Sequence, residues 1–104
     1  MRANQAALVV TIAAAAIAAP ARAQDVAGRN LAAPCAICHG TEGRSATADS
    51  PLIPLAGLPR DHIAAQMRAF RDGKRPATVM HQIAKGYTDP QIDMLAAWFA
   101  AQKR

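Results

Sequence analysis

The seven residues PCAICHG, Pro34 to Gly40, place both cysteines of the chain and one of its three histidines within five consecutive positions. Such a cluster of sulfur and imidazole side chains is compatible with four kinds of site: a redox-active dithiol, part of a zinc site, a disulfide, or the anchor of a covalent cofactor. The remainder of the sequence is needed to choose between them.

The N-terminal residues predict export. Met1 to Ala23 combine a basic start, an uncharged apolar run over 6–19 and a small-x-small ending, "ARA", which is the pattern of a cleaved secretory signal peptide. The apolar run is shorter than the roughly 20 residues of a membrane-spanning helix. We therefore expect cleavage after Ala23, no stable membrane span afterwards, a periplasmic location, and one mature domain over residues 24–104.

Charge and size narrow the class of protein. Two of the 12 basic residues lie in the predicted signal, which leaves 10 against 7 acidic residues and a net charge of +3. No basic run is interleaved with aromatic residues, so we expect no nucleic-acid partner. A mature chain of this length is close to the lower limit for a self-sufficient core, and it has only one Trp, one Tyr and two Phe. Such small domains usually need a disulfide, a metal or a large cofactor.

The apolar periodicity is helical throughout, with no alternating strand pattern, and predicts an all-α fold. The first helix is expected from about Val26 to Ala33, where Pro34 ends or bends it. A Gly- and Pro-rich loop follows over 40–59, then a helix over 59–73 and a short turn or helix over 81–85. The final helix has a capping-box pattern at Thr88 and Gln91, followed by an apolar stripe made of Ile92, Leu95, Ala96 and Phe99.

Cys35-x-x-Cys38-His39 is the spacing of c-type haem attachment. The two thiols must lie about one helical turn apart to add to the two vinyl groups of the porphyrin, and the adjacent imidazole then faces the iron. A thioredoxin-like dithiol would need strands, and a zinc site would need four ligands, whereas His62 and His81 are isolated. A disulfide across two residues is strained and leaves His39 unexplained. We therefore expect one covalent haem c, with His39 as an iron ligand.

The sixth iron ligand decides whether the iron transfers electrons or stays open to gases or peroxide. Met80 stands in a loop before the final helix, where its thioether can reach the second haem face, and we favour it as ligand. His81 is the alternative and would give two histidine ligands. Met67 falls on the apolar stripe of its helix, where core packing is expected, and Met94 lies inside the final helix.

Taken together, CxxCH, the Gly- and Pro-rich loop, Met80 and the amphipathic final helix resemble the class I cytochromes c. The segments "CAICHGTEG", "IPLAGLP" and "FRDGKRPATVMHQIAKGYTDPQIDMLAAWFA" (70–100) are similar to the haem subunit of flavocytochrome c sulfide dehydrogenase. The resemblance implies about four short helices around one haem c, thioethers at Cys35 and Cys38, and His39 and Met80 as axial ligands. It also implies that the Pro54 carbonyl accepts a hydrogen bond from Nδ1 of His39, and that Gly28 packs closely against Trp98 or Phe99.

The resemblance further implies single-electron transfer, without a catalytic site in this chain. The expected donor is an FAD-containing flavoprotein subunit that oxidises sulfide, and the expected acceptor is a soluble protein such as another cytochrome. The alternative is a free monohaem carrier that shuttles between respiratory complexes. A permanent subunit should bury an apolar patch, for which Ala77 to Val79 are candidates. A free carrier should carry a charged ring, for which the candidates are Arg68, Arg71, Lys74, Arg75 and Lys85.

Overall fold

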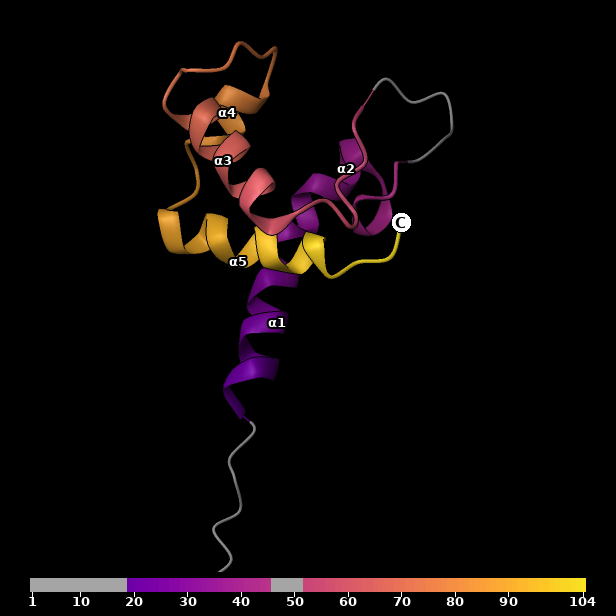
Figure 1. The fold of residues 1–104 in the computed structure, drawn as a ribbon. Coiled ribbons are helices and arrows are strands. Elements are labelled where there is room, and N and C mark those ends of the chain that lie inside the picture. Colours follow the sequence, from indigo (N-terminus) through magenta and orange to yellow (C-terminus); the bar gives the residue numbers. More distant parts are fainter. Residues whose placement is uncertain (1–18, 46–51) are drawn as a thin grey trace, which may run out of the picture.

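The computed structural model describes residues 19–45 and 52–104, so the predicted signal peptide lies outside the described residues up to position 18. The described part is helical and contains no strand, which confirms the all-α prediction for these residues. The described residues form five α-helices, where about four were expected, because the cysteine–histidine segment forms a one-turn helix of its own. Figure 1 shows how they are arranged. The helices are α1 (Ala19–Ala32), α2 (Ala36–His39), α3 (Arg60–Arg71), α4 (Met80–Ala84) and α5 (Asp89–Ala100).

Pro34 interrupts the first helix, as its missing N–H predicts. The α-helical hydrogen bonds stop at Ala32, and a 3-10 turn over Ala33–Cys35 joins α1 to α2. The helix begins earlier than the expected Val26, at Ala19. The alanine-rich sequence around the predicted cleavage point has high helix propensity, which accounts for the additional turns.

α3 begins after Pro59 and ends at Arg71, within two residues of the predicted bounds. Gly73 follows it with φ of +72°, the left-handed conformation that commonly ends a helix. Its apolar face is buried as expected: Ile63 is 5% exposed and Met67 is 6% exposed, while Phe70 packs partly buried against the same core. The prediction of core packing for Met67 is therefore confirmed.

α5 forms the centre of the core. Both hydrogen bonds of the predicted capping box are present: the Gln91 N–H donates to the Thr88 hydroxyl oxygen, and the Thr88 N–H donates to Oε1 of Gln91. The expected apolar stripe is buried throughout, with relative exposures between 0 and 1% for Ile92, Leu95, Ala96 and Phe99.

α1 and α5 cross in close contact, and Gly28 lies at the crossing (Figure 1). A Cβ atom placed on Gly28 would lie 2.8 Å from the Met94 carbonyl oxygen and 3.0 Å from Cβ of Trp98. The prediction that Gly28 permits close packing is thus confirmed for Trp98, with the Met94 backbone as the second contact.

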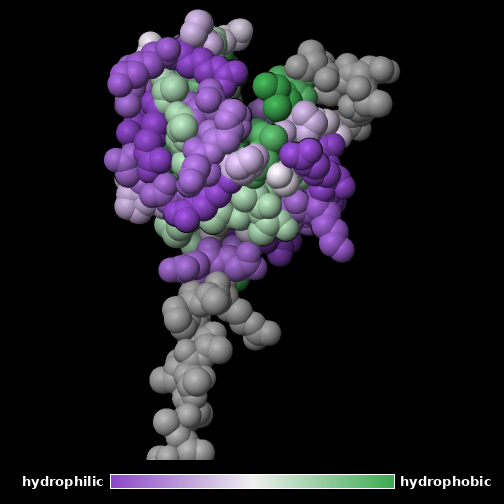
Figure 2. Space-filling model, viewed as in Figure 1, coloured by the Kyte–Doolittle hydropathy of each residue, from purple (hydrophilic) through white to green (hydrophobic). Residues whose placement is uncertain are grey.

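Two lobes stand on the same side of this crossing (Figure 1). One consists of α3, α4 and the loop between them, which pack on each other and on α5. The other consists of α2 and the two segments that flank the undescribed residues 46–51. Figure 2 shows a notch between the two lobes, with strongly hydrophobic residues on the surface beside it. Among the described residues, no helix has the length and apolar character needed to cross a membrane.

Candidate functional site

The 3-10 turn and α2 hold Cys35, Cys38 and His39 at positions three and four residues apart, which lie on one side of a helical turn. Cys35 is half-buried against the core, and burial raises the pKa of its thiol, with a smaller contribution from nearby Cys38. Cys38 is exposed, and the two cysteines are not joined by a disulfide. Ile37 points away from this side and is 88% exposed.

The chain reverses sharply after His39. Gly40 and Gly43 have φ of +83° and +77°, and Ser45 also has a positive φ, of +47°. The Ser45 N–H donates to the His39 carbonyl oxygen at 2.7 Å, and the Leu55 N–H donates to the Gly43 carbonyl oxygen at 2.7 Å. These two hydrogen bonds hold the turn closed. As a result, the segment that follows residues 46–51 lies beside His39.

His39 is oriented by this returning segment. Its Nδ1 lies 2.8 Å from the carbonyl oxygen of Ile53, and because a carbonyl only accepts, Nδ1 must carry the proton. In the neutral ring, Nε2 is then the nitrogen with a free lone pair. The acceptor is one residue before the predicted Pro54. The residue before a proline is restricted to extended conformations, and in this backbone the carbonyl of the Ile53–Pro54 peptide is the one that faces the ring.

Met80 is the first residue of α4 rather than part of the preceding loop, and it packs half-buried against the core cluster. The adjacent His81 is also half-buried, and its Nδ1 is buried without a hydrogen-bond partner among the described residues. Both residues belong to α4, and Figure 1 shows α4 in a different lobe from α2.

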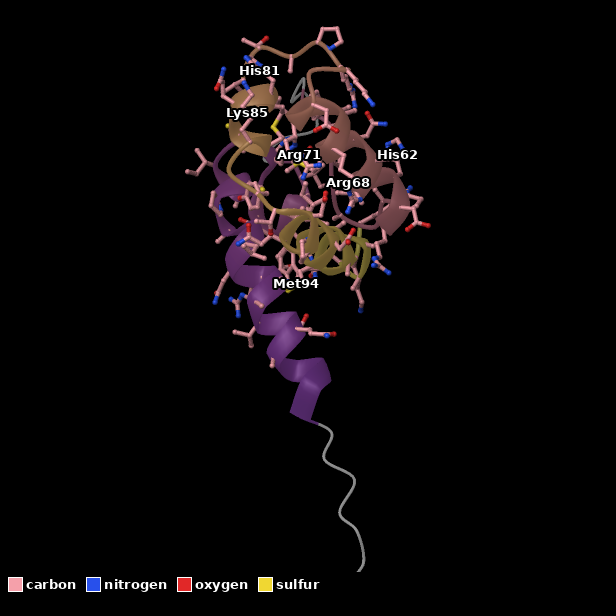
Figure 3. All side chains as sticks on the ribbon, turned by 90° about the vertical axis from the view of Figure 1, so that its left-hand side faces the viewer. His62, Arg68, Arg71, His81, Lys85 and Met94 are labelled. Atoms are coloured by element: carbon pink, nitrogen blue, oxygen red, sulfur yellow. The ribbon has the colours of Figure 1, made fainter. Side chains whose placement is uncertain are left out.

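The remaining candidates lie apart from this region. Figure 3 shows His62 on the outer side of α3, well away from His81 on α4. Met94 lies half-buried on α5, at the crossing with Gly28 of α1. Within residues 19–45 and 52–104, no three His, Cys, Asp or Glu side chains are grouped so that they could bind a metal ion. The described residues therefore offer no protein-only zinc site.

Tyr87 is a residue that the sequence analysis did not single out. Its hydroxyl donates to the Leu31 carbonyl oxygen at 2.9 Å, which ties the segment before α5 to the end of α1, just ahead of Cys35. Burial raises the pKa of the Tyr87 hydroxyl, with a smaller contribution from Cys35. The sequence contained a signal that could have singled out this residue: Tyr87 is the only tyrosine of the chain, and it directly precedes the capping Thr88.

The described residues fit a haem c group. The donor set of thiol, imidazole and thioether is the one that binds haem iron and its vinyl groups in c-type cytochromes. Isoleucine, leucine and valine are among the residues most often buried in folded proteins. Next to these donors, however, four such side chains are exposed. Two belong to the segment that returns to His39 and two flank Met80: Leu52 at 40%, Ile53 at 55%, Val79 at 51% and Ile83 at 39%.

Comparison with known proteins finds relatives whose names describe cytochromes or electron acceptors. The chain is 40% identical over 73 residues to the cytochrome subunit of sulfide dehydrogenase from Chlorobaculum tepidum, a match that covers 69% of this chain and 63% of that protein. It is 32% identical over 81 residues to cytochrome c-554(548) of Halomonas halodenitrificans, covering 74% of this chain and 94% of that one.

A third relative is the thiosulfate dehydrogenase electron acceptor of Thiomonas intermedia, at 39% identity over 72 residues. That match covers 69% of this chain and 33% of the relative. The chain thus spans less than two thirds of the length of the first and third relatives. No protein-family model matches the chain.

Proposed function

Because the chain belongs to the class I cytochromes c and carries covalently bound haem c, we propose that Cys35 and Cys38 form the two thioether bonds. We further propose that His39 and Met80 are the axial ligands. The observation that carries the assignment of His39 is its hydrogen bond to the Ile53 carbonyl. This bond fixes the ring orientation and leaves Nε2 available to the iron.

Each side chain has a separate task in this proposal. The half-buried Cys35 and the exposed Cys38 fix the group at the surface of α2. Met80 supplies a neutral sulfur, which favours the reduced iron and raises the reduction potential relative to a second histidine. Leu52 and Val79 exclude water. When bound, the haem iron supplies one-electron redox chemistry by alternating between its ferric and ferrous states.

The chain is an electron-transfer protein, and its proposed donor is the flavin of an FAD-containing subunit that oxidises sulfide. The similarity to a sulfide dehydrogenase cytochrome subunit supports this partner. In that arrangement this chain would accept the two electrons of sulfide oxidation one at a time from the flavoprotein, and would pass each to a soluble acceptor such as another cytochrome. The proposed location is the periplasm, after cleavage of the signal peptide at Ala23.

The surface around the attachment segment supports a permanent partner over a free carrier. Residues 30–41 include no Lys, Arg, Asp or Glu, and Ile37 within them is 88% exposed. The side of α2 that carries Ile37 is opposite to the cysteines and His39, so a group bonded to these residues does not cover it. Val79, in the predicted apolar patch Ala77 to Val79, is 51% exposed, but it lies beside Met80 and is assigned above to the haem, so Ile37 carries this argument. A protein that docks reversibly through charges would not need such a side chain at its surface.

The test is purification of the tagged full-length chain from its native host under mild conditions. We expect a flavoprotein to co-purify, and sulfide to reduce the haem only in the presence of that flavoprotein. Ile37→Lys should weaken the complex, whereas Val26→Lys should not, because Val26 is also an exposed aliphatic residue, at 58%, but lies on α1. A strictly monomeric wild-type preparation, reduced rapidly and salt-sensitively by respiratory donors, would instead identify a free carrier.

A further inference from the structure

We infer that Arg75 is a positioning residue for Met80: it fastens the loop between α3 and α4 onto α3, and so holds the methionine sulfur in place. The inference rests on the proposed role of Met80 as an iron ligand. Figure 1 shows this loop leaving the end of α3, extending to the top of its lobe and returning into α4, whose first residue is Met80.

Two side-chain contacts attach Arg75 to α3. Its guanidinium carbon lies 4.7 Å from the centre of the Phe70 ring, in a cation–π arrangement. Its Nη1 donates a hydrogen bond to Oε1 of Gln66, one turn earlier on the same helix. Arg75 is half-buried in this position. The planar, multiply donating guanidinium is suited to making both contacts at once.

The backbone of the loop is also attached to α3 at Lys74 and Arg75. The N–H groups of Lys74 and Arg75 both donate to the Ala69 carbonyl oxygen, at 2.8 and 3.2 Å. Pro76 follows and restricts Arg75 to an extended conformation, so the chain leaves α3 in a defined direction at this residue.

Beyond Arg75 the loop has few other attachments. Among the described residues, no backbone hydrogen bond is donated by positions 77–81, and donation resumes with Gln82, which bonds to the Val79 carbonyl oxygen at 2.9 Å. Pro76, Thr78 and Val79 are exposed. The next residues packed against the core lie in α4, where Met80 is half-buried and Ala84 is fully buried. A segment with few hydrogen bonds and little burial opens at low free-energy cost, so the contacts of Arg75 are the main restraint upstream of Met80.

Loss of these contacts should increase the fraction of molecules in which Met80 has left the iron. At the low end of their usual strengths, a cation–π contact and a hydrogen bond from a charged donor together correspond to a change of roughly thirtyfold in such an equilibrium. The apparent affinity for an external ligand rises in proportion to the fraction that is open. Imidazole, which binds ferric iron at a vacated position, therefore measures the opening directly.

The experiment compares wild-type ferric holoprotein with Arg75→Ala, Gln66→Ala and Lys74→Ala. Imidazole affinity is titrated, and the weak near-infrared sulfur-to-iron band is followed on heating, with far-UV circular dichroism as the measure of global folding. We expect Arg75→Ala to bind imidazole about thirtyfold more tightly and to lose the band well before it unfolds. Gln66→Ala should show a smaller change of the same kind.

Lys74→Ala is the matched control. It removes the positive charge of an exposed neighbouring residue whose side chain makes no hydrogen bond or ion pair with the described residues. It should behave as wild type. An imidazole affinity of Arg75→Ala within twofold of wild type, or an equal increase in Lys74→Ala, would overturn the positioning role. Absence of the band in the wild type would instead remove Met80 as ligand, and the inference with it.

Discussion

Replacement of Gly28 by alanine tests the close crossing of α1 and α5. The added methyl carbon would lie 2.8 Å from the Met94 carbonyl oxygen and 3.0 Å from Cβ of Trp98. Both neighbours are fixed to the backbone of α5, so the clash is relieved only if the helices move apart. Overpacking costs about 1–3 kcal/mol, and a clash with atoms fixed to the backbone belongs to the upper part of that range, about 2–3 kcal/mol. Alanine gains about 1 kcal/mol in helix propensity over glycine. The expected net loss of stability is therefore about 1–2 kcal/mol.

The assay is thermal unfolding of the ferric holoprotein, followed by far-UV circular dichroism. In a domain of this size a loss of 1 kcal/mol lowers Tm by about 4–8 °C, so Gly28→Ala should lower Tm by roughly 4–16 °C. Asn30→Ala, at an exposed position of the same helix, has the propensity gain without the clash and should leave Tm unchanged or slightly raised. A Gly28→Ala protein as stable as the wild type would show that the two helices do not cross as closely as described.

Three further substitutions probe the ligand, the loop and the acid response. Met80→Ala should abolish the near-infrared band and lower the reduction potential in a spectroelectrochemical titration, and unchanged values would exclude Met80 as ligand. Tyr87→Phe removes the hydrogen bond to the α1 carbonyl and should lower the free energy of unfolding by about 1 kcal/mol; no change in denaturant titration would contradict the bond. The Asp89 carboxylate accepts hydrogen bonds from Arg71 and Arg68, which lower its pKa below the ordinary 3.8. Its stabilising contribution is therefore present above that pH and is lost as the pH falls through the lower, folded-state pKa. Asp89→Asn should flatten this acid dependence of stability, and an identical acid profile would argue against the ion pairs.

Local chemistry explains which parts of the fold could be predicted. The cap of α5 depends on Thr88 and Gln91, three residues apart, and its buried stripe repeats with the helical period, so both follow from sequence alone. The interruption at Pro34 follows equally from one missing N–H group.

Contacts between distant residues were harder to predict. The acceptor for His39 is 14 residues away, and its identity depends on the path of the intervening loop rather than on any periodic pattern. Met80 was expected in the loop before a short turn or helix over 81–85, whereas α4 begins at Met80 itself, without a side-chain cap that the sequence could have signalled. The contact of Arg75 with Phe70 was also missed, because the sequence does not show that the loop folds back over α3.

The central claim is that haem is bonded to this chain through Cys35 and Cys38, and acid–acetone extraction of the purified protein tests it most directly. We predict that the haem stays with the polypeptide and that its colour coincides with the chain on a denaturing gel. Haem that passes into the organic phase, or a folded protein purified without colour, would contradict the account.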